Sequence, residues 1–215
     1  MFVFAGLWHL WIARNDLIWN NIHPSTSRLK VQIDASCSSW VDAYMKQSAS
    51  PFGSLLNNEV WSPPPEFMLK CNFDAAVFDN DAGVGAIIRD HRGKFVAAFN
   101  SRFACARDPL LAESMAAKEA LSWLKANDFR NLILESDSLL FCNRFVSSSL
   151  DLSYVGLVVK QCRSIANDIR NVSVHHVKRS ANHVAHVLAR VTGSSPVLGS
   201  WFSVPPSCIS HLVIA

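Results

Sequence analysis

The chain has 215 residues, 50% of them hydrophobic and 10% aromatic, and a formal net charge of +3. Such a chain can fill one well-buried core and carry flanking segments, which excludes an intrinsically disordered protein. Residues 70–190 hold 16 Lys and Arg against 12 Asp and Glu, an excess that modestly favours a polyanionic partner but is also common in ordinary domains. The six cysteines stand singly, so they predict neither a zinc site nor a disulfide framework and favour a reducing, intracellular compartment.

The N-terminal part of the chain predicts helix. Its apolar opening, residues 1–13, has no basic leading region and is too short to span a bilayer, so we expect a packed or amphipathic helix and no membrane association. Large side chains recur at three- and four-residue spacing through Trp19, and a second periodic stretch follows Pro24 and runs through Ile33, Trp40 and Tyr44. We therefore predict a helical segment over residues 1–46. Ser, Asn and Gly residues and a run of three prolines then predict an extended linker over residues 47–69.

From Lys70 the periodicity changes to that of an α/β domain. Strands are predicted at residues 71–78, 84–89 and 95–101, and the two short polar turns between them indicate antiparallel hairpins. A helix follows from Pro109 to about residue 127, then a buried strand at 132–134, helices at 138–146 and 152–168, a strand at 172–177 and a helix at 181–191. This order predicts a mixed sheet with helices on both faces over residues 70–192. Residues 193–215 form a tail whose role the sequence does not indicate.

Three acidic residues stand in apolar surroundings on successive elements of this domain. Glu113 projects from the middle of the apolar stripe of its predicted helix, among Ala117, Ala120 and Leu124. Asp74 lies inside a strand, where aspartate is depleted, and Asp137 follows a buried strand. Each has an ordinary alternative: Glu113 could reach solvent from the edge of its stripe, and Asp137 could cap the next helix. A buried carboxylate is costly without a charge partner or metal, so together the three suggest a metal site.

The segments around these acids resemble the ribonuclease H family. They read NFDAA at residues 72–76, GVGAIIRD at 83–90, AESMAA at 112–117 and ESDS at 135–138. The segment RSANHVAHVLA at 179–189 resembles the final helix of the ribonuclease H-like domains related to plant non-LTR retrotransposon polyproteins, and WIARND at 11–16 resembles the stretch before that domain. The likeness covers most of the chain, in order.

The resemblance implies a five-stranded sheet in which the first strand is central and Asp74, Glu113 and Asp137 bind two Mg²⁺ ions. Magnesium prefers hard oxygen ligands, and paired ions can activate the attacking water and stabilise the leaving oxygen. The implied activity is a metal-dependent endonuclease that hydrolyses the RNA strand of RNA–DNA hybrids, with selection of RNA through its 2′-hydroxyl. A nuclear location and a monomeric state are expectations from the family alone.

The sequence departs from the family pattern in two places. His186 stands where catalytically complete members usually carry a fourth carboxylate, and imidazole is a poor ligand for Mg²⁺ and a better one for Mn²⁺. His186 could also move protons near neutral pH, or simply be a polar residue beside the apolar face of its helix. The family's histidine-bearing loop is reduced here to residues 178–180, so neither His175 nor His176 takes its place. A zinc site at the four nearby histidines is not favoured by their spacing.

Candidate nucleic-acid contacts follow from the basic and amide residues near the predicted hairpin and last helix. They are Arg89, Arg92, Lys178, Arg179 and Asn182, any of which could instead be solvated. Three possibilities stay open at this point: the hybrid-cutting endonuclease, a noncatalytic nucleic-acid-binding or interaction domain derived from a retrotransposon ribonuclease H, and a transposon fragment with no cellular role. His186 and the short loop favour the second.

Overall fold

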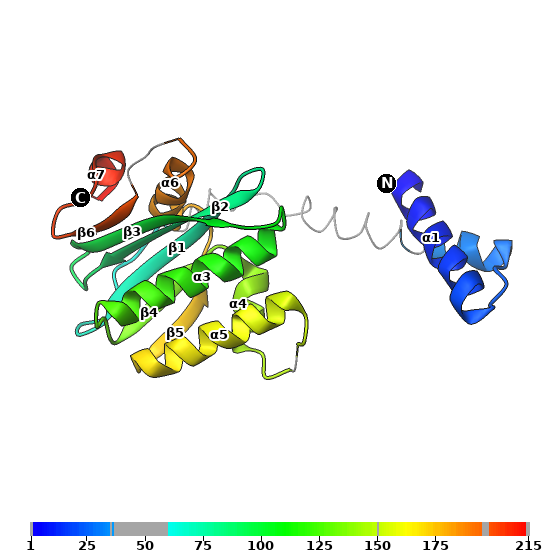
Figure 1. The fold of residues 1–215 in the computed structure, drawn as a ribbon, viewed down its shortest axis with the longest axis horizontal. Coiled ribbons are helices and arrows are strands. Elements are labelled where there is room, and N and C mark those ends of the chain that lie inside the picture. The colour runs from blue at the N-terminus through cyan, green and yellow to red at the C-terminus, as the bar shows by residue number, and fades with distance from the viewer. Residues whose placement is uncertain (1, 35, 37–59, 150, 195–197, 214–215) are drawn as a thin grey trace, which may run out of the picture. The chain divides into compact units, whose positions relative to one another are not determined.

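A computed structural model describes residues 2–34, 36, 60–149, 151–194 and 198–213 of the chain (Figure 1). The chain divides into two units, Met1–Asn57 and Asn58–Ala215. In the first unit helix α1 spans Phe2–Asn20, and residues 26–34 are helical as predicted. His9 Nε2 lies 2.8 Å from Ser36 Oγ, and the rings of Trp8 and Trp11 stack with centroids 5.6 Å apart. Trp40 and Tyr44 lie outside the described residues.

The second unit is built on a mixed sheet of six strands. They are β1 (Leu69–Val77), β2 (Asp81–Arg89), β3 (Phe95–Ala104), β4 (Leu132–Ser136), β5 (Val172–His176) and β6 (Gly199–Phe202), in the order β5-β4-β1-β2-β3-β6. The pairs β1–β2 and β2–β3 are antiparallel, as the short turns predict, whereas β4 runs parallel to β1 and to β5. The expected central position of the first strand and the mixed α/β class are confirmed.

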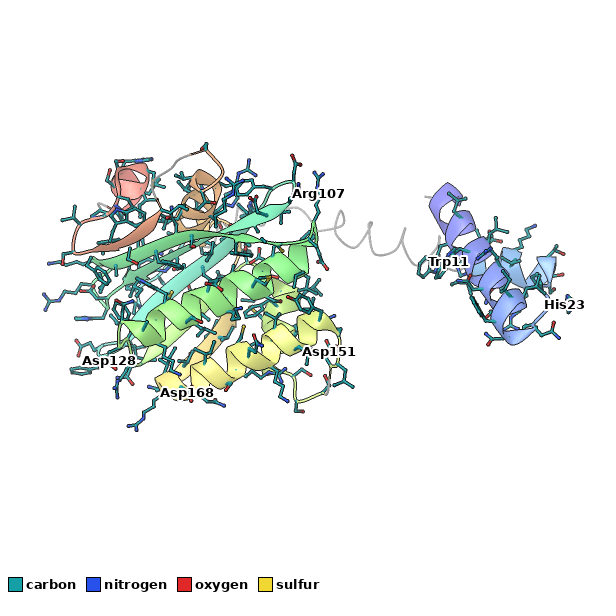
Figure 2. All side chains as sticks on the ribbon, viewed as in Figure 1. Trp11, His23, Arg107, Asp128, Asp151 and Asp168 are labelled. Atoms are coloured by element: carbon teal, nitrogen blue, oxygen red, sulfur yellow. The ribbon has the colours of Figure 1, made fainter. Side chains whose placement is uncertain are left out.

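The helices cover both faces of the sheet (Figure 1). On one face lie α3 (Pro109–Ala126), α4 (Leu139–Val146) and α5 (Tyr154–Ile169), packed on a core that includes Phe73, Leu121 and Leu134. On the other face lie α6 (His183–Val191) and α7 (Ser207–Val213), packed on Ile87 and Ala98. Helices α3 and α5 run in the same direction. Both begin at the end of the domain that Arg107 and Asp151 mark in Figure 2, and both finish at the opposite end, which Asp128 and Asp168 mark.

Side-chain caps fix where the helices begin. Asp108 accepts hydrogen bonds from the backbone of Leu110 and Leu111 at 2.9 and 3.2 Å, and Pro109 follows it at the first helical position. Ser138 Oγ caps α4 by accepting from the Phe141 amide at 3.4 Å. Because only Asp137 and the cap residue Ser138 separate β4 from α4, Asp137 is held at the carboxyl end of that strand.

The tail gives the sheet its sixth strand, where the family resemblance implies five. Strand β6 pairs antiparallel with β3 from Ala97↔Phe202 to Asn100↔Gly199. Trp123 of α3 donates to Ser200 Oγ at 2.8 Å, and the Ile209 side chain of α7 is fully buried against α6. The tail is therefore part of the domain core. Trp61 and Ser62, which the sequence assigns to the linker, also contact the domain, at Arg89 and Lys70.

None of the helices in the described part of the chain combines the length and apolar character that crossing a bilayer requires.

Candidate metal centre

The site lies where strand β4 stops pairing with the central strand β1. Their ladder ends at Asn72↔Glu135, so the β4 side of β1 is open from Phe73 onward. Asp74 is two residues further along β1, and Asp137 follows β4. Glu113 reaches the same point from the second turn of α3. Three elements that are distant in sequence therefore bring one carboxylate each to the point where the β1–β4 pairing ends.

The three carboxylates lie close enough to share a cation. One oxygen from each of Asp74, Glu113 and Asp137 can be chosen so that all lie within 4.8 Å of one another. The Asp74 side chain is 1% exposed and that of Asp137 is 10% exposed. Burial and mutual repulsion make three negative charges at this spacing expensive unless a cation or protons balance them.

The pKa values of Asp74 and Glu113 are raised in this buried cluster. Burial raises the pKa of Asp74 to about 7, with further upward contributions from the charge of Asp137 and a hydrogen bond to it, while Arg179 acts in the opposite direction. Burial also raises the pKa of Glu113 well above its usual range, and the charges of Asp74 and Asp137 add to this effect. Without a metal, the centre therefore retains protons near neutral pH.

Two carboxylate oxygens in the centre have no hydrogen-bond partner among the described residues. They are Asp74 Oδ1 and Glu113 Oε2, and both are buried from solvent. Buried carboxylate oxygens normally accept hydrogen bonds, so unpartnered oxygens at this spacing are what a hard divalent cation would coordinate. The residues present therefore fit a divalent metal ion.

His186 lies on α6 next to the carboxylates. Its Nδ1 is 2.6 Å from Asp74 Oδ2, and its side chain is 22% exposed. Burial lowers the pKa of His186, and the positive charges of Arg179 and Arg190 lower it further. The structure thus brings together all four residues that the sequence predicts as catalytic, with a histidine in contact with the central aspartate.

Arg179 is the predicted nucleic-acid residue that the structure brings to the centre. Its Nη1 is 3.3 Å from Asp137 Oδ2, and its Nη2 is 3.0 Å from His186 Nε2. The side chain remains 65% exposed, so it can also meet a ligand that approaches from solvent. Lys178 precedes it and is likewise exposed.

The other predicted nucleic-acid residues lie elsewhere or are enclosed. Arg92 is exposed in the turn after β2. It follows Arg89, which pairs with Lys70 on β1, four residues before Asp74. The expectation that Arg89 contacts phosphate is corrected, because its side chain is buried, stacks on Trp61 and donates to Asn72 Oδ1 at 2.9 Å.

The expectation that Asn182 contacts nucleic acid is corrected in the same way. The residue is fully buried, and its amide donates hydrogen bonds to Phe73 and Asp137 within the domain. Sequence reasoning missed the residues that surround it. The sequence does contain a signal for them. Along the buried strand β1 the polar residues Lys70, Asn72 and Asp74 alternate with Cys71 and Phe73, and this alternation indicates that the polar side chains share one face of the sheet.

Known proteins that are similar to this chain share its fold. Residues 72–192 match the family described as reverse transcriptase-like, and no curated protein sequence matches the chain. RNase H1 from the halophilic archaeon Halobacterium salinarum is similar at 23% identity and a TM-score of 0.54, over 58% of this chain and 96% of that one. The N-terminal RNase H domain of a Mycobacterium tuberculosis protein is 19% identical, with a TM-score of 0.50, over 58% of this chain and 92% of that one.

A third solved structure is LC11-RNase H1, isolated from compost by a metagenomic approach and solved in complex with an RNA/DNA hybrid. It is 19% identical to this chain, with a TM-score of 0.50, over 57% of this chain and 94% of that one. These likenesses establish the fold rather than the activity. Since the family match spans more than half of the chain, the protein belongs to the reverse transcriptase-like family, with a domain of the ribonuclease H fold.

Proposed function

We propose that the protein is a metal-dependent endonuclease that hydrolyses the RNA strand of RNA–DNA hybrids, with two divalent ions, Mg²⁺ or Mn²⁺, held by Asp74, Glu113 and Asp137. The observation that carries this proposal is the pair of buried, unpartnered oxygens, Asp74 Oδ1 and Glu113 Oε2, inside a cluster of three carboxylates. A cluster that served only packing would be expected to have donors for these atoms.

Each residue of the centre has a role that follows from its position. Asp74, Glu113 and Asp137 supply the negative charge that holds the ions, which when bound activate the attacking water and stabilise the leaving oxygen. Arg179 and Lys178, both exposed beside the centre, contact phosphates of the substrate, and Arg92 contacts the backbone farther along. Selection of the RNA strand comes from its 2′-hydroxyl. The likeness of the sequence motifs to retrotransposon polyproteins supports a plant retrotransposon origin.

The test is hydrolysis of an RNA–DNA hybrid with a labelled RNA strand, across titrations of Mg²⁺ and of Mn²⁺. We expect cleavage of the RNA strand in the hybrid and none of single- or double-stranded RNA. Asp74→Asn should remove cleavage with either ion, because it takes a charged ligand from the middle of the cluster. Cleavage that survives Asp74→Asn would place the activity elsewhere or in a contaminant.

A noncatalytic domain that binds nucleic acid is the second candidate. The observation that favours it is His186, which offers the cluster an imidazole in contact with Asp74 at 2.6 Å rather than a fourth carboxylate. The same experiment separates the two functions, because hybrid binding without cleavage under any ion condition supports the noncatalytic domain.

A further inference from the structure

Asn182 occupies the N-cap position directly before helix α6, but its side chain does not cap the helix. Asparagine is among the preferred capping residues because its side-chain oxygen usually accepts from the first-turn amides. Here no such bond forms, and the side chain is fully buried. The amide is turned toward the sheet, and its function must be sought there.

The Asn182 amide joins the two strand segments that carry Asp74 and Asp137. Its Nδ2 donates to the carbonyl oxygen of Phe73 at 2.9 Å, directly before Asp74 in β1, and to Asp137 Oδ1 at 3.4 Å. An amide nitrogen has two hydrogens, so both are used. One side chain therefore fixes the separation between two of the three carboxylate positions.

Asn72 in turn fixes the orientation of the Asn182 amide. Asn72 Nδ2 donates to Asn182 Oδ1 at 3.3 Å and to Glu135 Oε2 at 2.9 Å, and Asn72 Oδ1 accepts from Arg89 Nη2 at 2.9 Å. Glu135 is neutralised by Lys70, whose Nζ lies 2.8 Å away. Lys70, Asn72, Arg89, Glu135 and Asn182 are all buried. Rotating either amide would place like groups together in a low-dielectric interior, so the network has one favourable arrangement.

Trp61 closes the network at the end away from the carboxylates. The Arg89 guanidinium lies 3.5 Å from the centre of the Trp61 ring, and Lys70 Nζ donates to the Ser62 carbonyl at 2.7 Å. Stacking of this kind holds a guanidinium in one plane. The segment around residues 61–62 thus keeps Arg89 in position to hold Asn72.

We infer that Asn182 is a positioning residue for the metal centre, and that Trp61 supports it through Arg89 and Asn72. This inference rests on the proposed function, since it concerns how the carboxylates are held ready for ions. Neither residue coordinates an ion. Their contribution is to keep Asp137 and the Asp74 segment at a fixed spacing, so that ion binding need not order them.

The test is the affinity of the full chain for Mn²⁺ measured by titration calorimetry, beside urea unfolding of the metal-free protein. Asn182→Ala should weaken Mn²⁺ binding by about 10- to 100-fold, as loss of such outer-shell partners usually does. The matched control is Asn100→Ala, which removes another buried asparagine, one that accepts from the Gly199 amide at 3.1 Å and contacts no carboxylate of the centre. Asn100→Ala should lower stability but leave Mn²⁺ affinity at the wild-type value.

Trp61 provides an independent variant that keeps the core polar groups intact. Trp61→Ala should weaken Mn²⁺ binding less than Asn182→Ala does, and Trp61→Phe should restore it, because the indole nitrogen has no partner among the described residues and only the ring face is used. Equal affinities for Asn182→Ala and Asn100→Ala would overturn the role of Asn182. Wild-type affinity in Trp61→Ala would overturn the role of Trp61. A wild type that binds no Mn²⁺, with Asp74→Asn unchanged from it, would instead remove the proposed function and this inference together.

Discussion

The imidazole of His186 contacts the carboxyl group of Asp74 between helix α6 and strand β1, with Nδ1 of the ring 2.6 Å from Oδ2. The guanidinium of Arg179 faces both ring nitrogens of His186, with its Nη2 3.1 Å from Nδ1 and 3.0 Å from Nε2. The lowered pKa of His186 agrees with a neutral ring. A neutral imidazole has one ring nitrogen without a hydrogen, and only that nitrogen can bind an ion.

Replacing Glu113 with Gln should make the metal-free protein more stable while removing its activity. Burial and two neighbouring negative charges raise the pKa of Glu113, so its charged form is disfavoured in the metal-free fold. Gln has the same shape without the charge and can donate to a neighbouring carboxylate. We expect a higher melting temperature in chelator and complete loss of hybrid cleavage.

The control for this variant is Glu119→Gln on the same helix. Glu119 lies outside the centre, 3.7 Å from Lys118, and its replacement should change neither property measurably. A Glu113→Gln protein that melts below the wild type would show that Glu113 is stabilised by contacts other than a metal.

The metal-free protein should lose stability as the pH rises from about 4 to about 7, because the folded-state pKa of Asp74 is raised to about 7 from an ordinary value of 3.8. The folded state then binds more protons than the unfolded state across this window, so unfolding free energy falls with increasing pH. The lowered pKa of His186 acts in the opposite direction below the ordinary histidine pKa of 6.5. The informative quantity is therefore the difference between the wild type and Asp74→Asn.

Melting temperatures of both proteins in chelator, measured between pH 4.5 and 7.5, test this linkage. Asp74→Asn should show a smaller decline with pH than the wild type, and saturating Mn²⁺ should remove most of the wild-type decline because bound ions keep the carboxylates ionised. Parallel curves for the two chelated proteins would mean that Asp74 does not titrate in this range.

Gly85 allows α6 to pack directly on strand β2. A Cβ added at this position would lie 2.3 Å from the Ala189 nitrogen and 2.5 Å from the Ala185 oxygen, so the backbones would have to separate. Gly85→Ala should destabilise the protein by about 1–3 kcal/mol, the usual cost of overpacking. It should also weaken Mn²⁺ binding, because α6 carries His186 and directly follows Asn182. Urea unfolding and calorimetry test both effects, with exposed Ser122→Ala as the control.

Ile209 tests whether the tail is part of the domain core. This side chain of α7 is fully buried against α6, so Ile209→Ala should lower the free energy of unfolding in urea by about 2–5 kcal/mol. Val204 in the same tail is 71% exposed, and Val204→Ala should stay within about 0.5 kcal/mol of the wild type. Equal stability of the two variants would show that the tail does not pack on the sheet in solution.

The sequence alone predicts the metal centre because its residues violate the local pattern. An acid within an apolar stripe, as at Glu113, or within a buried strand, as at Asp74, has few low-energy explanations, and the structure brings both to one point. The hairpins are predicted for a similar reason, since short polar turns between alternating segments allow only antiparallel pairing.

What the sequence does not predict depends on contacts between distant segments. The sequence places Arg89 as a basic residue at a strand end and predicts that it is exposed, whereas in the fold Trp61, from the preceding extended segment, covers it. Strand β6 has only four residues and is defined by pairing with β3 and by Trp123 packing near Phe202, rather than by its own periodicity. Asn182 has the position of a helix cap, and only the fold reveals that its amide faces the sheet.

The identity of residue 186 should determine which ion supports cleavage. Imidazole binds the softer Mn²⁺ more readily than Mg²⁺, which prefers oxygen ligands. The wild-type protein should therefore cleave the hybrid faster with Mn²⁺ than with Mg²⁺. His186→Asp supplies an oxygen ligand at the same point on α6 and should narrow this difference by raising activity with Mg²⁺. His183→Asp, an exposed change on the same helix, adds the same charge outside the centre and should leave the ratio unaltered. Initial rates of hybrid cleavage across titrations of both ions provide the ratio. A wild type that uses the two ions equally, and a His186→Asp protein with the same ratio, would show that residue 186 does not contribute to ion binding.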